Sequence, residues 1–357
     1  MTITSPFRDI AIQGRIVIAG PCSAESERQV LDAARGVASA GAAIFRAGVW
    51  KPRTKPGTFE GIGTPALKWL VKARAETGLP VATEVATREH VEEALAAGID
   101  MLWVGARTTT SPFAMDEVAK AILDSGRAAT TAVLVKNPVN PDIELWIGAM
   151  ERLHAAGVTR LAAVHRGFSA YNAAPYRNDP MWHIPLELRR RFPTLDIICD
   201  PSHIGGSRRL IAPLSQRAID MGFDGLIIES HCNPDEALSD AAQQIIPSAL
   251  AEILASLTDR NQSCTTEGLE AMRAEIDHID NELMALLAQR MKVVRDIGEY
   301  KRSRSIPVVQ PERFDRLLTR HMSEAETLGL RPEFIKNLLT VIHAESVNRQ
   351  IDRPSPQ

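Results

Sequence analysis

The residues Ile16-Val17-Ile18-Ala19-Gly20-Pro21-Cys22 form an apolar run that ends on a thiol. Seven more apolar runs follow along the chain, and nearly all of them end on a charged residue: 44–46, 81–84, 101–107, 132–136, 161–166, 197–200 and 226–229. A strand that is buried on both faces has a continuous apolar run instead of an alternating one. Reactive residues at the ends of successive strands are typical of a (β/α)8 barrel, whose active site lies at the carboxyl ends of the strands.

Helical patterns separate these runs, for example over residues 27–40, 65–77, 88–97 and 143–156. Several of them are followed directly by glycine, which ends helices because it accepts the left-handed conformation. Strands that alternate with helices in this way form a parallel sheet. We therefore predict that residues 1–257 fold as an α/β domain, a (β/α)8 TIM barrel.

The pattern changes after the barrel. Residues 258–266 are predicted to form a polar linker, and residues 267–352 a smaller all-α domain of three helices. The first of these helices, from about 267 to 302, would be about 50 Å long, which is more than a small domain can cover. It therefore needs a partner along its length. Further helices are predicted at about 312–326 and 332–350, and residues 353–357 are predicted to be a disordered tail.

The composition narrows the class of protein. The chain has 357 residues, of which 45% are hydrophobic, enough for one large core and a second domain. Its net charge of −3 argues against a nucleic-acid-binding protein, and no apolar stretch is long enough to span a membrane. The four cysteines form no C-x-x-C pair, and the amino terminus lacks the pattern of a signal peptide. We expect a cytoplasmic enzyme with no nucleic-acid or membrane partner.

Four residues at the ends of the first, seventh and eighth runs could bind a metal: Cys22, His203, Glu229 and Asp240. These strands become neighbours when the barrel closes. Each residue alone is more simply explained as a polar loop residue, but together they favour a metal site. The mixed thiolate, imidazole and carboxylate set suits a divalent transition metal, for which we expect Mn, with Fe, Co or Zn as alternatives. We expect no organic cofactor.

A second cluster is cationic and consists of Arg46, Lys51, Arg53, Arg107, Lys136 and Arg166. Bringing so many positive charges to one barrel mouth is unfavourable unless anions neutralise them. A salt-bridge network is the alternative, but the acids at these strand ends, chiefly Glu84 and Asp200, are too few. Arginine and lysine bind phosphate and carboxylate. The sequence therefore indicates a phosphorylated, carboxylate-bearing substrate beside a metal that polarises a carbonyl.

Several motifs together resemble the 3-deoxy-D-arabino-heptulosonate 7-phosphate (DAHP) synthase family, in its short, core-barrel class, over about residues 10–257. They are Gly20-Pro21-Cys22-Ser23, Arg46 with Lys51-Pro52-Arg53-Thr54, Gly105-Ala106-Arg107, Lys136-Asn137, His165-Arg166-Gly167, Asp200-Pro201-Ser202-His203, and Glu229 through Ser239-Asp240. The Lys-Pro-Arg-Thr motif separates this family from the 3-deoxy-D-manno-octulosonate 8-phosphate synthases, which remain the alternative. The loop at residues 55–61 departs from the family pattern in having Lys-Pro-Gly.

The resemblance implies the condensation of phosphoenolpyruvate with erythrose 4-phosphate. It implies that Arg107, Lys136 and Arg166 bind the phosphoenolpyruvate phosphate, and that Arg46 and Lys51 lie near its carboxylate. Arg53 and Thr54 would bind the aldose phosphate, and Glu84 would position the water that adds to carbon 2. The metal would orient and polarise the aldehyde. The expected catalytic residues of the barrel are Lys51, Glu84 and Lys136.

The helical domain carries its own polar set on apolar stripes. Arg290 and Lys301 are eleven residues apart, about three turns, so they share a face of the long helix. Ser346 and Gln350 continue the line of Ile342 on the last helix. Together with Arg273 and Arg313, these residues resemble the all-helical chorismate mutase family over about residues 265–352. Phe314 and Gln310 depart from it, because the family usually has Glu and often Asp there.

This second resemblance implies the rearrangement of chorismate to prephenate in a homodimer whose long helices intertwine. Lys301 and Gln350 would donate to the ether oxygen, Ser346 would line the site, and Arg273 would enter the partner's site. Arg273, Arg290 and Arg313 would bind the carboxylates. The alternative is a dimerisation and feedback-regulatory module with little turnover. In either case we expect the helical domain, when it binds prephenate, to dock on the barrel and reduce its activity.

Overall fold

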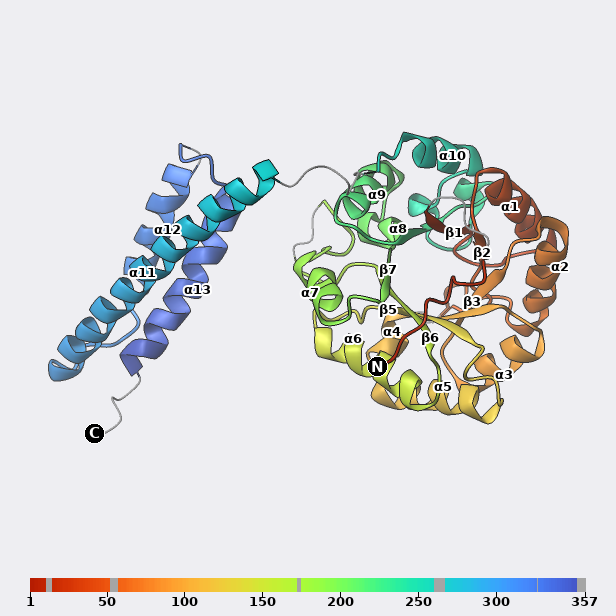
Figure 1. Cartoon of the computed structure of the whole chain (residues 1–357), viewed down its shortest axis with the longest axis horizontal. Helices are drawn as coiled ribbons and strands as arrows, with labels where there is room; N and C mark the ends of the chain where they lie inside the picture. The colour runs from red at the N-terminus through yellow and green to blue at the C-terminus, as the bar shows by residue number, and fades with distance from the viewer. Residues whose placement is uncertain (11–14, 52–56, 172–174, 260–266, 326, 352–357) are drawn as a thin grey trace. The chain divides into compact units, whose positions relative to one another are not determined.

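Eight parallel strands close into a barrel in the order β1 to β8 in this computed structural model (Figure 1). The structure describes residues 1–10, 15–51, 57–171, 175–259, 267–325 and 327–351. The strands are β1 Ile16–Gly20, β2 Ile44–Arg46, β3 Val81–Val85, β4 Met101–Val104, β5 Ala132–Lys136, β6 Arg160–His165, β7 Asp196–Cys199 and β8 Gly225–Glu229. The predicted (β/α)8 barrel is confirmed, and each apolar run contains one strand.

Helices connect the strands on the outside of the barrel (Figure 1). They are α1 Glu27–Ser39, α2 Leu67–Thr77, α3 Arg88–Ala96, α4 Ala106–Thr109, α5 Pro112–Asp124, α6 Ile143–Ala155, α7 His183–Arg191, α8 Pro201–Gly205, α9 Ile211–Asp220 and α10 Pro247–Ser256. Short 3-10 turns lie at Thr64–Ala66, Arg208–Leu210, Pro234–Glu236 and Ala241–Gln243. Side chains of Ser26, Thr87 and Asp142 accept hydrogen bonds from the first-turn amides of α1, α3 and α6, which fixes where these helices begin.

The strand side chains alternate between two cores. On β5, Val133 and Val135 pack outward against the helices, while Ala132 and Leu134 pack into the barrel interior. Side chains alternate along a strand with a period of two, so Lys136 continues the inward row. The inward apolar rows of the other seven strands lead in the same way to polar residues. The step is two residues from Ile44 to Arg46, Ala82 to Glu84, Val164 to Arg166, Ile198 to Asp200 and Ile227 to Glu229, and four residues from Ile18 to Cys22 and Trp103 to Arg107. The reactive residues therefore form a layer directly above the apolar filling of the barrel.

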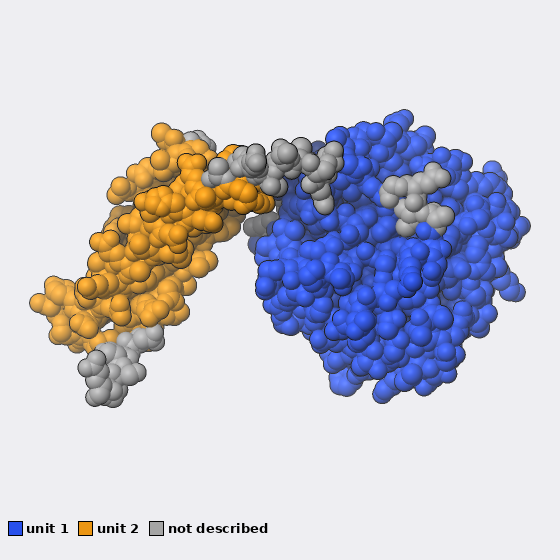
Figure 2. All heavy atoms as spheres, viewed as in Figure 1, with its two compact units in different colours: residues 1–260 blue, residues 261–357 orange. Residues whose placement is uncertain are grey.

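The chain divides into two compact units, residues 1–260 and 261–357 (Figure 2). The second contains α11 Glu267–Ser303, α12 Pro311–Ala325 and α13 Pro332–Ile351, close to the three predicted helices. Most of the predicted linker (residues 260–266) and the predicted tail lie outside the described residues. None of the described helices has both the length and the hydropathy needed to cross a membrane.

The helical unit has little core of its own. Its buried side chains, among the residues described, are those of Val294, Ala325 and Ser346. Large apolar side chains are exposed all along α11: Leu269, Met272, Ile276, Ile279, Leu283, Met284, Leu286, Val293, Ile297 and Tyr300. A contiguous apolar surface of this kind marks an interaction site.

Candidate active site

A pocket lies at the carboxyl ends of the barrel strands. It is lined by Lys51, Glu84, Gly105, Ala106, Arg107, Lys136, Arg166, Arg177, His203 and Asp240. A second hollow, at the amino ends of the strands, also has charged walls, but there Arg160 pairs with Asp9 at 3.1 Å and Asp100 pairs with Arg74 at 2.9 Å. The pocket at the carboxyl ends is the one that collects the predicted reactive residues.

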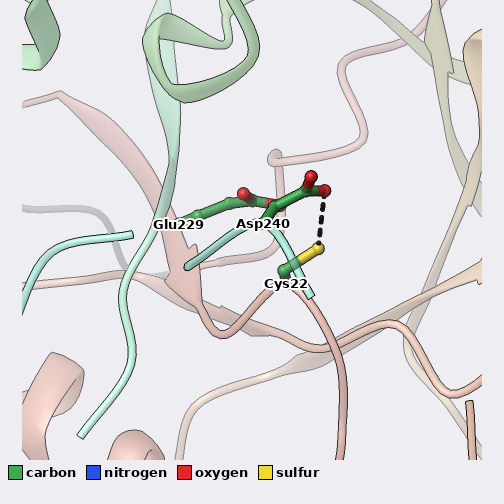
Figure 3. Close-up of side chains that lie close together, drawn as sticks. All are labelled: Cys22, Glu229 and Asp240. Carbon is green, nitrogen blue, oxygen red and sulfur yellow. Dashed lines mark hydrogen bonds between the residues drawn. The ribbon is translucent and has the colours of Figure 1, made fainter. Parts of the chain in front are cut away.

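Three of the four predicted metal ligands meet beside this pocket (Figure 3). Ligand atoms of Cys22, Glu229 and Asp240 all lie within 4.8 Å of one another, and the Cys22 thiol donates to Asp240 Oδ2 at 3.3 Å. The fourth residue, His203, has its Nε2 atom 3.8 Å from Glu229 Oε1. Its Nδ1 atom lies 2.8 Å from Asp200 Oδ2, the arrangement in which a carboxylate orients a metal-ligating imidazole. The soft and hard donors fit a divalent transition metal.

Burial and neighbouring charges set the protonation of these ligands. Burial, and then the nearby Glu229 carboxylate, raises the pKa of the Cys22 thiol to about 12. Burial alone would raise the pKa of Glu229, but His203, Arg46 and Lys51 hold it below its usual value. Burial lowers the pKa of His203, although Asp200 opposes this effect. The imidazole and the carboxylates are thus ready to bind a cation at neutral pH, whereas the thiol must first lose a proton.

Asp240 is held in an uncommon backbone conformation. Its φ of 48° and ψ of 35° place it in the left-handed region, which aspartate tolerates better than most residues. Arg177 Nη1 lies 3.0 Å from Asp240 Oδ1 and donates to Gln243 Oε1 at 2.6 Å. Gln243 in turn donates through Nε2 to Glu229 Oε2 at 2.6 Å. Arg177 and Gln243 therefore fix the orientation of two candidate ligands.

The cationic residues divide into two groups. Arg107, Lys136 and Arg166 line the pocket, with Lys136 Nζ 2.8 Å from Asp200 Oδ2. Burial lowers the pKa of Arg166 to about 10; Asp200 opposes this, while Arg177 and Arg107 add to it. Arg166 is still charged at neutral pH and lies close to two other guanidinium groups.

Arg46 and Lys51 form the other group, next to the metal ligands. Arg46 is 1% exposed, its Nη1 lies 3.0 Å from Glu229 Oε1, and its guanidinium carbon is 4.6 Å from the centre of the Trp103 ring. Lys51 Nζ donates to the carbonyl of Cys22 at 3.1 Å and lines the pocket. Arg46 thus neutralises a candidate metal ligand, a contact that the sequence did not predict. The predicted aldose-phosphate residues, Arg53 and Thr54, lie outside the described residues.

The side chain of Glu84 can reach the pocket because the residue next to it in space, Gly105, has no side chain. The side chain of Glu84 is 9% exposed. A Cβ atom on Gly105, on the adjacent strand end, would lie only 2.1 Å from Glu84 Oε1. Any side chain at this position would therefore displace the carboxylate that lines the pocket.

The helical unit brings together part of its predicted set. Arg290 Nη1 donates to Ser346 Oγ at 2.6 Å, and Gln350 Nε2 donates to the Ser346 carbonyl at 3.1 Å. Lys301 Nζ donates to the Val308 carbonyl at 2.7 Å. Arg273 pairs with Glu270 on its own helix at 2.7 Å and is exposed.

Phe314, which differs from the pattern of the resembled mutase family, lies beside Arg313 on α12. Its ring stacks on that of His343 on α13, with ring centres 4.0 Å apart. An aromatic pair therefore stands where the family usually has a carboxylate. His343, Ser346 and Gln350 are three and four residues apart on α13, so they share one face of that helix.

Comparison with known proteins agrees with both units. The model of the DAHP synthetase I family matches residues 10–265, and that of chorismate mutase type II matches residues 272–351. The phospho-2-dehydro-3-deoxyheptonate aldolase of Thermotoga maritima is 31% identical over 229 residues, which are 64% of this chain and 64% of that protein. Its crystal structure superposes with a TM-score of 0.61 at 28% identity, covering 69% of this chain and 68% of that one.

Two further relatives match the barrel and the helical unit respectively. A 2-dehydro-3-deoxyphosphooctonate aldolase of Nitratidesulfovibrio vulgaris is 29% identical over 63% of this chain and 84% of its own length. The T-protein of Enterobacter agglomerans is 36% identical over 85 residues, which are 24% of this chain and 23% of that protein.

Proposed function

We propose, because the chain belongs to the DAHP synthetase I family, that its barrel condenses phosphoenolpyruvate with erythrose 4-phosphate to DAHP and that its helical unit converts chorismate to prephenate. The observation that carries the first assignment is the pocket in which Lys51, Arg107, Lys136, Arg166 and Arg177 converge beside a candidate metal site. Such a pocket suits a substrate with a phosphate and a carboxylate. Both reactions would take place in the cytoplasm.

The anionic substrate would be divided between the two cationic groups. Arg107, Lys136 and Arg166 would bind the phosphate of phosphoenolpyruvate, since they line the pocket together. Lys51 would face its carboxylate. Arg46 would act mainly by holding Glu229, because its guanidinium is buried against that carboxylate. Arg53 and Thr54 remain our candidates for the phosphate of the aldose.

Cys22, His203, Glu229 and Asp240 would hold the divalent metal, with Mn as the expected ion and Fe, Co or Zn as alternatives. When bound, the metal supplies a Lewis acid for the aldehyde oxygen. Carbon 3 of phosphoenolpyruvate attacks the aldehyde carbon, water adds at carbon 2, and inorganic phosphate leaves with cleavage of its C–O bond. Glu84 would position that water, and Lys136 would stabilise the charge on the departing phosphate. Placement and electrostatics, rather than a covalent nucleophile, would provide the rate enhancement.

The alternative for the barrel is an octulosonate 8-phosphate synthase, which the relative from Nitratidesulfovibrio vulgaris supports. The two enzymes differ in the aldose. A synthase assay with each aldose, after chelation and addition of Mn²⁺, separates them: turnover with erythrose 4-phosphate and not with arabinose 5-phosphate supports our proposal. The reverse preference would replace it with the alternative, and equal activity without any metal would remove the proposed metal role.

The helical unit would act as a dimer. The apolar side chains of α11 are exposed to water along the helix. The same helix of a second copy has the matching length and would bury them. Arg290, Lys301, Arg313, Ser346 and Gln350 would bind chorismate from one protomer and Arg273 from its partner. The pericyclic rearrangement needs no acid or base, so these residues would fix the folded conformer and stabilise the ether oxygen.

The competing proposal for the helical unit is a dimerisation and feedback module. Phe314 favours it, because an apolar ring replaces a polar side chain of the resembled family. Prephenate formation by the full chain, lost in Arg290→Ala while the synthase rate is kept, supports the mutase. If no prephenate forms at any enzyme concentration, the mutase proposal is wrong and the dimerisation and feedback module replaces it. We also propose that prephenate lowers the synthase rate through this unit; a synthase rate that does not respond to prephenate would contradict that proposal.

A further inference from the structure

Two residues outside the strand ends, Arg177 and Asn178, contact both halves of the barrel site. Neither follows a strand, and neither belongs to the cationic or metal-binding sets derived from the sequence. They lie between β6 and α7, directly before the isolated bridge at Asp179.

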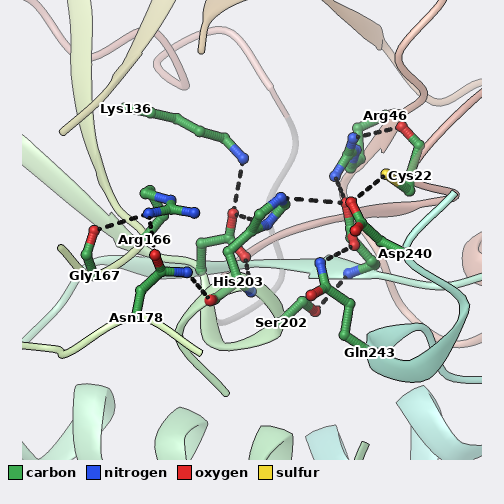
Figure 4. Close-up of polar contacts among 12 residues, drawn as sticks. Cys22, Arg46, Lys136, Arg166, Gly167, Asn178, Ser202, His203, Asp240 and Gln243 are labelled. Atoms are coloured by element: carbon green, nitrogen blue, oxygen red, sulfur yellow. Dashed lines mark hydrogen bonds and ion pairs between the residues drawn. The ribbon is translucent and has the colours of Figure 1, made fainter. Parts of the chain in front are cut away.

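The amide of Asn178 joins the anion-binding group to a candidate metal ligand (Figure 4). Its Oδ1 accepts from Arg166 Nη1 at 2.7 Å, and its Nδ2 donates to the carbonyl of His203 at 2.7 Å. Asn178 is 7% exposed, so water does not readily replace either contact. One end of the amide must face a donor and the other an acceptor, which fixes its orientation.

Arg177 reaches the other ligands. Its guanidinium contacts Asp240 directly, at 3.0 Å, and Glu229 indirectly, through the amide of Gln243. Hydrogen bonds and ion pairs run from Arg46 through Glu229 and Gln243 to Arg177. The peptide bond links Arg177 to Asn178, which contacts Arg166.

The backbone holds this dipeptide in place without help from the charges. The amides of Arg177 and Asn178 both donate to the carbonyl of Ile204, at 3.0 and 3.2 Å, on α8, the helix that carries His203. Two glycines allow the close approach. A Cβ on Gly206, which has φ +63°, would lie 2.5 Å from Arg177 Cβ, and one on Gly167, with φ +79°, would lie 2.9 Å from Asn178 Cβ.

We propose that Arg177 and Asn178 are positioning residues that couple anion binding at Arg166 to metal binding at Cys22, His203, Glu229 and Asp240. This inference rests on the proposed function of the barrel. An anion on Arg166 holds that guanidinium against Asn178, and Asn178 in turn holds the backbone that carries His203. Each ligand thus favours the arrangement of side chains that the other needs. Each ligand therefore raises the affinity for the other by the same factor.

The test measures Mn²⁺ binding to the full chain by electron paramagnetic resonance, with and without an anion. The anions are phosphoenolpyruvate and, in a parallel arm, sodium sulfate against sodium chloride at equal ionic strength. Sulfate has the shape of phosphate but no carboxylate that could reach the metal. In the wild type we expect each anion to lower the Mn²⁺ Kd about tenfold, a typical coupling between sites.

The variants separate coupling from simple damage. Asn178→Ala loses both contacts, so each ligand should bind more weakly alone. The ratio of the Mn²⁺ Kd without anion to the Mn²⁺ Kd with anion should fall towards one. Asn178→Asp keeps the acceptor for Arg166 but loses the donor to His203. Its carboxylate should weaken anion binding at Arg166, so the Mn²⁺ Kd is measured at saturating anion, where the ratio should still fall towards one; this variant also serves if the alanine variant does not fold. Asn140→Asp makes the same change at an exposed loop position and should keep the wild-type ratio.

A full wild-type ratio in either Asn178 variant overturns the proposal, and so does a wild-type ratio of one. Failure of the proposed function gives a different result. In that case the wild type has no synthase turnover and binds no phosphoenolpyruvate, while the sulfate arm still reports whether the two sites are coupled.

Discussion

Replacing Arg46 with Met should destabilise the metal-free barrel strongly. Arg46 and Glu229 are 1% and 0% exposed in their side chains and pair at 3.0 Å. Methionine fills most of the space of the arginine stem, so the main loss is the charge that faces Glu229. Removing one partner of a buried ion pair costs about 3–5 kcal/mol, because the remaining charge stays buried without compensation.

This free energy converts to a large thermal shift. For a domain of this size a loss of 1 kcal/mol lowers the melting temperature by about 2–4 °C, so Arg46→Met should lower the midpoint of the barrel transition by roughly 6–20 °C. The matched control is Arg35→Met. Arg35 pairs with Glu76 at 2.9 Å, but the two side chains are 55% and 32% exposed, and a surface pair contributes about 0–1 kcal/mol.

Calorimetry of both variants, after chelation and again with Mn²⁺, checks the reasoning. Mn²⁺ should raise the melting temperature of Arg46→Met by more than that of the wild type, because the ion supplies the positive charge that Glu229 lacks. A metal-free midpoint within about 2 °C of the Arg35→Met control would refute the assignment of the pair as a buried charge contact. A smaller response to Mn²⁺ than in the wild type would refute the view that ion and guanidinium stabilise the same carboxylate.

Three other perturbations test separate parts of the molecule. Burial raises the pKa of the Cys22 thiol to about 12, so binding of the ion must release the thiol proton. Affinity for Mn²⁺, measured between pH 6 and 8, should rise about tenfold per pH unit in the wild type and be nearly flat in Cys22→Ser; equal slopes would disprove thiolate ligation. Gly105→Ala should displace Glu84 and lower the synthase kcat at least about tenfold. The control Gly148→Ala, with nothing within 4 Å of the added atom, should leave kcat unchanged. Equal kcat values in the two variants would mean that catalysis does not need Glu84 in its present place. Leu283→Glu, on the exposed row of α11, should convert the proposed dimer to a monomer in light scattering. A monomeric wild type would contradict the dimer, and a dimeric variant would show that another surface holds the copies together.

The barrel was predictable because its signal is repeated. Each strand provides an apolar run, and each inward row ends two or four residues later on a polar side chain, as Ile227 does before Glu229. Buried parallel strands must be apolar on both faces, so the runs stand out from the amphipathic helices between them. The layer of site residues follows from the same alternation, which is why Cys22, Glu229 and Lys136 could be proposed from the sequence alone.

The contacts between those residues were not predictable. Arg46 and Glu229 are far apart in sequence, and only closure of β1, β2 and β8 brings their side chains together. Arg177, Asn178 and Gln243 lie on a loop and a 3-10 turn, where no periodicity indicates the direction of a side chain. The short helix α8, which places His203, is only five residues long and is below the length at which a helical pattern can be recognised.

The left-handed backbone of Asp240 limits how this centre could be re-engineered. Aspartate and asparagine adopt that conformation more readily than most residues, so cysteine at this position would carry a conformational penalty of about 1–2 kcal/mol before any ion is bound. A designer who wishes to soften the donor set towards zinc or copper should therefore leave residue 240 as an oxygen donor. Glu229 offers no easier exchange, although it lies on a regular strand, because its carboxylate neutralises the buried guanidinium of Arg46.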